Sequence, residues 1–371
     1  MGYICMGCGA DIQTVDKNAT GYVPKRVLDE HDDKDPLYCQ RCFRIKHYMD
    51  VSTNNLTNDD YLKVISQIGD KNGLVVLTVD IFDFSGSFVP QIKRLTGAKD
   101  VIIVGNKVDL LPKSTNKDKI LNWLKNMCAD EGLSVLDAVL VSAKKGYFID
   151  ELMKMIYKYK GNRDVYFVGS SNVGKSKLIN QILKRYAGTE KDVLTVSYYP
   201  ETTIGLVGFP LEDGTSMYDT PGILNRHQYL HYITRQSLKM IIPGKEINPQ
   251  IFQLDPEQTL FIGGLARIDF LSGSGARIHA AMYFSNRLNI HRTKTINADE
   301  LFNTKRYSLL VPPFSKEENI PKFKETEIKI RDTLKYDIVI SGLGFVSIKG
   351  PFKVKVQAPA MVGVYVRKAI I

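Results

Sequence analysis

One stretch in the middle of the chain has the residues and spacing of a phosphate-binding loop. Gly169–Ser176 reads GSSNVGKS and matches the pattern GxxxxGK[ST]. In such a loop, backbone N–H groups and the N-terminus of the following helix bind phosphate oxygens. Lys175 would neutralise charge on the β- and γ-phosphates, and Ser176 would bind Mg²⁺ through its hydroxyl. The predicted nucleotide contacts come from Ser171, Asn172, Val173, Gly174, Lys175, Ser176 and Lys177.

Two motifs that precede this loop have the chemistry to recognise guanine. They consist of Asn106, Lys107 and Asp109 (NKVD), and of Ser142, Ala143 and Lys144 (SAK). A carboxylate at Asp109 can accept the N1 and 2-amino N–H groups of guanine, whereas adenine offers neither donor, so a hydrogen bond would be missing. A backbone N–H of the second motif can donate to guanine O6. The motifs therefore predict GTP and GDP as ligands.

The N-terminal part of the chain carries two C-x-x-C pairs. These are Cys5 with Cys8, and Cys39 with Cys42. Each pair places two thiolates on one tight turn, and two such turns complete a tetrahedral Cys₄ zinc site. A thioredoxin-like redox pair is the alternative, but no βαβ pattern surrounds either motif. Structural Zn²⁺ is the prediction, and the isolated Cys128 is expected to be a core residue.

The elements that must position these motifs follow from the apolar pattern. Continuous apolar runs at 74–80, 101–105, 138–141 and 165–168 predict parallel strands that are buried on both faces. Helices are expected over 117–130, 146–159 and 177–183, which completes an α/β domain. In open sheets of this class, ligands bind at the carboxyl ends of the strands, where the motifs stand. After position 222, a helix at 229–241 and several strands between 260 and 366 predict a β-rich α+β domain.

Composition limits the partners and the compartment. The chain has 371 residues, five cysteines and no apolar run approaching the roughly 18 residues of a membrane helix. A soluble, cytoplasmic protein without membrane contact is expected. The first 224 residues have 28 basic and 28 acidic residues, whereas the remainder has 22 and 12. This excess predicts a polyanionic partner for the C-terminal part, although a basic surface that serves only solubility is the alternative.

Cationic and aromatic residues lie together in the basic C-terminal part. Such a combination suits RNA, because cations bind phosphates and rings stack on bases. It also suits a protein surface, and many of these aromatic residues are expected to belong to a core. The candidate residues are Arg287, Arg292, Lys294, Lys305 and Arg306, with Tyr283, Phe284 and Tyr307 nearby.

The order of the motifs resembles a circularly permuted GTPase. NKVD and SAK come before the phosphate-binding loop, and Asp219–Gly222 (DTPG) follows it; in translation-factor-like GTPases the guanine motifs come last. With the cysteine pairs, this layout resembles the YqeH family, which is associated with assembly of the small ribosomal subunit. The resemblance implies a zinc module (1–55), a permuted GTPase domain (56–224) and a basic C-terminal domain (225–371) that contacts RNA or the ribosome. A monomer is expected.

The resemblance also implies how GTP would be hydrolysed. The implied catalytic residues are Lys175, Thr203, Asp219 and Gly222. Thr203 would bind Mg²⁺, but Glu201 stands where the family usually has glycine, so Thr202 is an alternative. Ile223 occupies the position where many GTPases have a water-orienting glutamine. Slow intrinsic hydrolysis is therefore expected, stimulated by the assembly partner and by K⁺.

Asn172 is the residue that connects this expectation to potassium. In potassium-activated GTPases an asparagine at this loop position binds the ion, and the alternative is that Asn172 only shapes the loop.

Two other functions remain open at this level. One is a GTPase that acts on another RNA. The second is a nucleotide-stabilised RNA-binding scaffold with negligible turnover, which the apolar Ile223 makes plausible. In the leading interpretation, permutation connects Gly222 directly to the C-terminal domain, which would read the nucleotide state.

Overall fold

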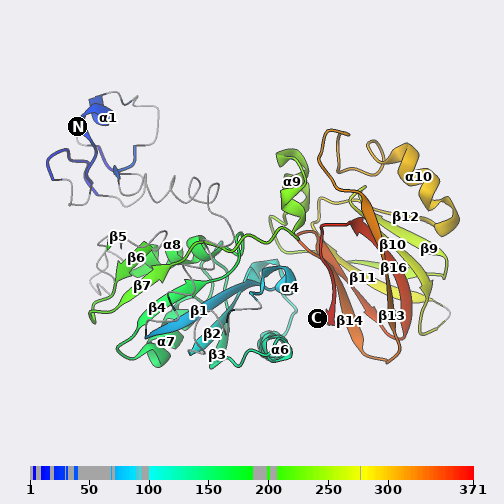
Figure 1. The fold of residues 1–371 in the computed structure, drawn as a ribbon, viewed down its shortest axis with the longest axis horizontal. Helices are drawn as coiled ribbons and strands as arrows, with labels where there is room; N and C mark the ends of the chain where they lie inside the picture. Colours follow the sequence, from blue (N-terminus) through cyan, green and yellow to red (C-terminus); the bar gives the residue numbers. More distant parts are fainter. Residues whose placement is uncertain are drawn as a thin grey trace.

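The computed structural model describes residues 3–5, 10–16, 21–29, 31, 37–40, 68, 72–89, 92, 100–186, 199–200, 207–275 and 277–371 (Figure 1). The helices in this part of the chain are α1 (Lys25–Asp29), α4 (Phe84–Ser87), α6 (Lys117–Asp130), α7 (Ile149–Lys160), α8 (Lys175–Tyr186), α9 (Arg235–Ile241) and α10 (Ala298–Lys305). Short 3-10 helices occur at Val108–Leu110, Tyr229–His231 and Thr295–Asn297.

A seven-stranded sheet forms the centre of the N-terminal half, in the order β3-β2-β1-β4-β7-β6-β5. Its strands are β1 (Gly73–Asp80), β2 (Val101–Asn106), β3 (Asp137–Leu140), β4 (Asp164–Val168), β5 (Tyr199–Pro200), β6 (Val207–Pro210) and β7 (Ser216–Asp219). The first four and β7 run parallel, while β5 and β6 are antiparallel. The predicted buried parallel strands are therefore confirmed.

Both faces of this sheet are covered, which explains its continuous apolar strands. On β1, alternate side chains enter two different cores: Leu77 packs toward α6, whereas Val76 packs toward α7 and α8. The parallel strands carry their carboxyl ends to one edge of the sheet. The loops after β2, β3, β4 and β7, which hold the four predicted motifs, consequently meet there.

The C-terminal half consists of two antiparallel five-stranded sheets, in the orders β12-β9-β10-β16-β13 and β17-β14-β15-β11-β8. One apolar core contains side chains from both sheets, so they pack face to face. The strands are β8 (Gln250–Leu254), β9 (Gln258–Ile262), β10 (Ala266–Ser272), β11 (Ile278–Phe284), β12 (Ile290–Lys294), β13 (Phe323–Ile330), β14 (Lys335–Ile340), β15 (Gly344–Lys349), β16 (Phe352–Pro359) and β17 (Val364–Lys368).

The helix predicted over 229–241 is wrong in its first half. A 3-10 turn at Tyr229–His231 is followed by a break, and α9 begins only at Arg235. The Thr234 hydroxyl accepts the backbone N–H of Ser237 at 3.3 Å. This N-cap starts a new helix, which the apolar spacing alone does not indicate.

The two halves share an apolar core at their junction. The core on the α6 face of the seven-stranded sheet includes Ile247, Val339, Phe345 and Ile370 of the C-terminal half. The Trp123 indole N–H on α6 donates to the carbonyl of Lys368 at 2.9 Å. Figure 1 shows the C-terminus and β14 beside α6.

Among the residues that the structure describes, no helix has the length and apolar composition needed to cross a membrane.

Candidate nucleotide-binding site

The loop between β4 and α8 requires its glycines. Gly169 and Gly174 have φ values of 157° and 94°, which are rarely adopted by other residues. A Cβ at Gly169 would lie 2.3 Å from the carbonyl oxygen of Thr78, and one at Gly174 would lie 2.5 Å from Asn106 Nδ2. The loop thus packs directly against the ends of neighbouring strands, and its pattern of glycines follows from that contact.

Lys175 is a buried cation at the start of α8. Its Nζ donates to the carbonyls of Gly169 at 2.9 Å and Ser170 at 3.3 Å. Burial lowers the pKa of Lys175 to about 8, although the charge of Asp219 opposes this shift. An anion bound in the loop would therefore stabilise the charged lysine, as phosphate binding requires.

Asp219 at the end of β7 faces the same loop. Its Oδ2 accepts the Ser176 hydroxyl at 3.1 Å, while its buried Oδ1 has no hydrogen-bond partner among the described residues. Burial raises the pKa of Asp219 to about 6, and Lys175 and Ser176 oppose the shift. A hydroxyl beside an unpartnered carboxylate oxygen suits a hard cation such as Mg²⁺.

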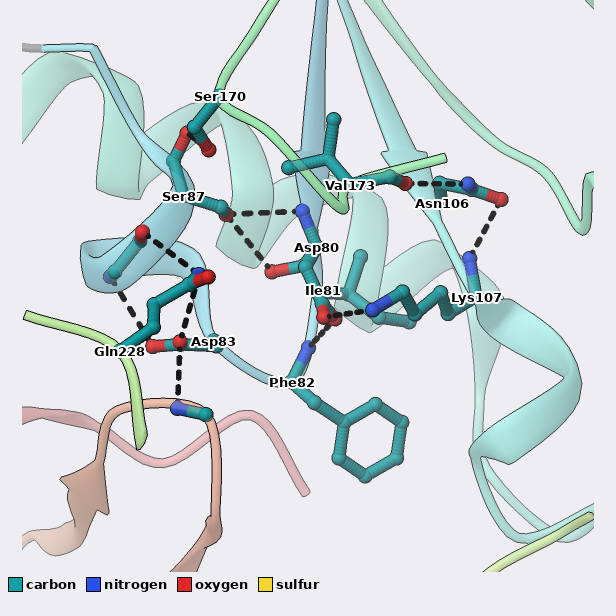
Figure 2. Close-up of polar contacts among 12 residues, drawn as sticks. Asp80, Ile81, Phe82, Asp83, Ser87, Asn106, Lys107, Ser170, Val173 and Gln228 are labelled. Carbon is teal, nitrogen blue, oxygen red and sulfur yellow. Dashed lines mark hydrogen bonds and ion pairs between the residues drawn. The ribbon is translucent and has the colours of Figure 1, made fainter. Parts of the chain in front are cut away.

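The side chain of Asn106 connects the predicted base-binding motifs to the phosphate loop. Its Nδ2 donates to the Val173 carbonyl at 2.7 Å, and its Oδ1 accepts backbone N–H groups from Lys107 at 2.8 Å and Ala143 at 3.0 Å. Figure 2 shows the contacts with Val173 and Lys107. The carboxamide of Asn106 thus contacts two distant parts of the sequence: Val173, 67 residues away, and Ala143, 37 residues away.

Asp109 is held in place by the second motif. The Ser142 hydroxyl donates to Asp109 Oδ1 at 2.7 Å and accepts the backbone N–H of Lys145 at 3.0 Å. The other carboxylate oxygen remains for a ligand, and Lys144 is exposed, with its Nζ donating to the Gly244 carbonyl. Lys177 is also exposed, on α8. The structure therefore brings the NKVD, SAK and phosphate-loop residues together.

The segment after β7 closes the site. Ser171 donates its backbone N–H to the Ile223 carbonyl at 2.8 Å, and Ile223 donates to Gly169 at 3.3 Å. A Cβ at Gly222 would lie 2.8 Å from Ser171 Cα and 3.0 Å from Lys175 Nζ. The DTPG segment thus lies directly against the phosphate loop. Thr202 and Thr203, the candidates for a further Mg²⁺ ligand, lie outside the described residues.

Half of the proposed cysteine set is described. Cys5 and Cys39 are buried next to each other, and the backbone N–H of Cys39 lies 3.1 Å from Cys5 Sγ. The structure thus brings one cysteine from each pair together. Cys8 and Cys42 lie outside the described residues, and the described part contains no group of three or more metal-ligating side chains.

Several of the candidate RNA-binding residues are already engaged within the C-terminal sheets. Arg306 lies 4.8 Å from the ring centroids of Phe302 and Phe323, and Arg287 donates to the Lys239 carbonyl at 2.7 Å. Tyr283 and Phe284 are buried core residues on β11, so they are not stacking surfaces. Arg292 donates weakly to the Gln253 carbonyl at 3.5 Å; Lys294 and Lys305 are exposed, as is Tyr307, at 36%.

Sequence reasoning missed Asp80 and Ser87, which contact Lys107 and Ser170 of the site. Asp80, at the end of β1, forms an ion pair with Lys107. Ser87 accepts the Ser170 hydroxyl at its carbonyl oxygen, at 2.9 Å. Figure 2 shows the ion pair between Asp80 and Lys107, with Ser170 next to Ser87. An acidic residue at a strand end was the only sequence signal for this support.

Two family models match the chain. Residues 277–370 match the family described as YqeH-like, C-terminal, and residues 164–258 match the family described as 50S ribosome-binding GTPase. The second match begins at β4 and does not include NKVD or SAK, which agrees with a permuted order of the motifs.

Three curated relatives illustrate the range of similarity. The protein described as YqeH, uncharacterized, from Bacillus subtilis (strain 168), is 44% identical over 370 residues, which cover 99% of each chain. NO-associated protein 1, chloroplastic/mitochondrial, from Arabidopsis thaliana is 30% identical, covering 93% of this chain and 69% of that one. Ribosome biogenesis GTPase A of Thermotoga maritima is 30% identical over 166 residues, covering 44% of this chain and 57% of that one.

Replacement of Asp109 by asparagine should change base preference. The asparagine amide would face the N–H groups of guanine, so GDP affinity should fall by about 100-fold or more, whereas xanthosine diphosphate offers a carbonyl oxygen and should gain. Competition binding with both nucleotides measures this ratio. Asp118→Asn, at an exposed carboxylate in the first turn of α6, is the control. An Asp109→Asn protein that still prefers GDP would contradict the assignment.

Proposed function

The chain belongs to the YqeH family and carries a GTPase domain, and from this premise we propose that it is a GTP-hydrolysing switch in ribosome biogenesis, acting in small-subunit assembly. The observation that carries this proposal is the meeting of Asn106, Val173 and Ala143 at one sheet edge. A base-selective loop and a phosphate loop held by one side chain are what guanine-nucleotide binding needs. The likeness to a ribosome biogenesis GTPase supports the ribosomal role.

The proposed roles at the phosphate end follow from the contacts. Lys175 binds phosphate oxygens of GTP, and Ser176 with Asp219 holds Mg²⁺, directly or through water. Mg²⁺, when bound, neutralises charge on the β- and γ-phosphates. Thr203, or Thr202, completes the set in the GTP state, and Gly222 donates its backbone N–H toward the γ-phosphate. Loss of that phosphate would release the segment after β7.

Slow turnover is part of the proposal. Ile223 is apolar and packs partly against the core, so it offers no group to orient an attacking water. Stimulation by the ribosomal partner and by K⁺ would supply the missing stabilisation of charge. Asn172 is exposed within the loop and has a φ of 64°. Asparagine tolerates this backbone region, so the conformation alone also explains its presence.

The Asn172→Gly substitution separates these two roles. Glycine adopts the positive φ without strain but provides no oxygen for an ion. If Asn172 binds K⁺, the wild type should hydrolyse GTP about tenfold faster in K⁺ than in Na⁺, and this ratio should fall to one in the variant. Phosphate release at matched ionic strength measures both rates. A ratio that is unchanged by the substitution would assign Asn172 a role in loop shape only.

The proposed division of labour has three parts. Residues 1–55 form the zinc module, 56–224 the permuted GTPase domain, and 225–371 the domain that contacts the ribosomal particle and responds to the nucleotide. Exposed cations such as Lys294 and Lys305 are the C-terminal side chains available for RNA. A monomeric, cytoplasmic protein fits this role, since the partner is the ribosomal particle itself.

Co-sedimentation with small ribosomal subunits tests partner and switch together. The protein should pellet with the subunits in a non-hydrolysable GTP analogue and remain in the supernatant in GDP. Large subunits and unrelated structured RNA are the controls. Binding only to the unrelated RNA would favour a GTPase with another RNA target.

Single-turnover hydrolysis, with and without subunits, distinguishes the switch from a scaffold. A rate that stays negligible in both conditions would favour the scaffold.

We also propose that the N-terminal cysteines bind structural zinc. The support is the adjacency of Cys5 and Cys39, which come from different C-x-x-C pairs. An N–H group directed at a cysteine sulfur is a common feature around metal-bound thiolates. Cys128 differs, because burial and, to a smaller extent, Glu131 raise the pKa of its thiol to about 12. It would remain protonated and is unsuited to bind a metal.

Element analysis should find one zinc ion per purified chain. Cys5→Ser and Cys39→Ser should each lose it and unfold the N-terminal module, because zinc binding and folding of small modules are coupled. Cys128→Ser should retain the full zinc content. A metal-free wild-type protein whose thermal unfolding is unaffected by a chelator would rule out the zinc site.

A further inference from the structure

A buried segment connects the nucleotide site to the C-terminal sheets. Residues 80–88 begin at the last residue of β1 and include α4. On the nucleotide side, Asp80 pairs with Lys107, and the Ser87 carbonyl accepts the Ser170 hydroxyl. The Ser87 hydroxyl lies 2.9 Å from the backbone N–H of Asp80, which joins the two ends of the segment. Figure 2 shows how one short turn supports both the base-binding lysine and the phosphate loop.

The opposite side of this segment is held by the carboxylate of Asp83. Its Oδ1 accepts the backbone N–H of Gly86 at 3.1 Å. Its Oδ2 accepts the Ser341 hydroxyl at 2.8 Å, the Gly342 N–H at 2.9 Å and, more weakly, Gln228 Nε2 at 3.4 Å. Ser341 and Gly342 form the turn between β14 and β15, 258 and 259 residues along the chain. One carboxylate thus joins both halves of the protein.

The residues after Gly222 reach the same segment. Asn225 Nδ2 donates to the Gly86 carbonyl at 2.6 Å, and Gln228 Nε2 donates to it at 3.1 Å. A Cβ at Gly86 would lie 2.1 Å from Ser341 Oγ and 2.4 Å from the Asp83 carboxylate oxygens. The packing is therefore too close for any side chain, and small displacements of the C-terminal sheets would be transmitted to residues 80–88.

A buried arginine from β17 neutralises this acidic junction. Arg367 is 3% exposed, lies 3.3 Å from Asp337 Oδ2 and donates to the Ile81 carbonyl at 3.4 Å. Its guanidinium lies about 5 Å from the rings of Trp123 and Phe345 (4.9 and 5.0 Å). Burial and the neighbouring Asp80 raise the pKa of Asp83, whereas its hydrogen bonds and Arg367 oppose the shift. The junction thus buries the Arg367–Asp337 ion pair close to Asp83, and Arg367 contacts the N-terminal half at the Ile81 carbonyl.

We propose that Asp83 is a positioning residue for guanine-nucleotide binding, through which the C-terminal sheets control how tightly the nucleotide is held. Asp83 acts through Asp80 and Ser87, which fix Lys107 and the phosphate loop. This route is separate from the covalent link at Gly222, since it passes through residues 80–88. The inference rests on the proposed function, because it assumes that the site described above binds GDP and GTP.

Nucleotide binding and the contact at Asp83 must influence each other equally, which gives the contact a regulatory role. If the junction strengthens nucleotide binding, then bound nucleotide strengthens the junction by the same factor. A ribosomal particle that draws the C-terminal sheets away from Asp83 in the GDP state would therefore accelerate the release of GDP. The partner would act as an exchange factor without touching the nucleotide.

Release of fluorescent GDP from the isolated protein tests the proposal. Ser341→Ala removes one donor to Asp83 from the far side of the junction, and GDP dissociation should become about fivefold faster. Asp83→Asn presents an N–H₂ group to donors and should have a larger effect. Because the two residues act as a pair, the effect of the double substitution should be smaller than the product of the single effects.

Asp269→Asn is the matched control. Asp269 is also buried but accepts hydrogen bonds from Thr259 and Arg267 within the C-terminal sheets. The Asp269→Asn substitution should lower the thermal stability and leave the rate of GDP dissociation unchanged. This result would show that a general loss of stability does not by itself accelerate GDP release. The assay temperature lies below the unfolding transition of all variants.

Three outcomes separate the inference from the proposed function. Wild-type protein that fails to bind GDP would overturn both. Wild-type binding with unchanged dissociation in the Ser341→Ala and Asp83→Asn proteins would overturn only the role of Asp83. If Asp83→Asn does not fold, the result for Ser341→Ala alone decides. That substitution removes one hydroxyl, and the Asp83 carboxylate keeps its other hydrogen-bond donors. Faster release in this variant and normal release in Asp269→Asn would support the proposal.

Discussion

The arrangement of the nucleotide site depends on the carboxamide of Asn106. Its Nδ2 donates to the phosphate loop, and its Oδ1 accepts N–H groups from the NKVD and SAK loops. Asn106 is 2% exposed, so water cannot replace these partners. Leaving a buried polar group unpaired costs about 1–3 kcal/mol, which makes any displacement of one loop relative to another unfavourable. In the proposed site, the selectivity for a base and the position of the phosphates would therefore depend on the same side chain.

Permutation changes the connections of the sheet but leaves the neighbours of each strand in place. In the order β2-β1-β4-β7, the phosphate loop and the DTPG segment lie at adjacent strand ends, and NKVD lies on the other side of β1, whichever comes first in the chain. The altered connection matters elsewhere. Residues 225–228, which follow DTPG, bind the Gly86 carbonyl at the junction with the C-terminal sheets. The segment that would respond to the γ-phosphate thus leads directly into the contact between the halves.

The sequence was sufficient for the features that depend on local patterns. The strands with continuous apolar runs, α6 and the phosphate loop between β4 and α8 were predicted, because burial on both faces and the glycine spacing are visible in short windows. The YqeH family was also recognisable. The support from Asp80 and Asp83 was not, since Lys107 lies 27 residues from Asp80, and the partners of Asp83 in the C-terminal half lie more than 140 residues away. Likewise, the sequence left open whether Tyr283 and Phe284 stack on RNA or belong to a core, and their burial on β11 decides for the core.

The junction combines two kinds of interaction with different consequences. The shared apolar core, which includes Val339 and Phe345, stabilises contact between the halves but tolerates small shifts, because apolar contacts lack direction. The Asp83 carboxylate is different. Removing an ion from water costs several kcal/mol, and the hydrogen bonds from Ser341 and Gly342, together with the nearby charge of Arg367, oppose this cost. Because hydrogen bonds depend on distance and angle, the contacts of Asp83 resist small shifts more than the apolar core does. Such a contact suits a switch, since a graded, apolar interface would transmit only a small part of a displacement to the nucleotide.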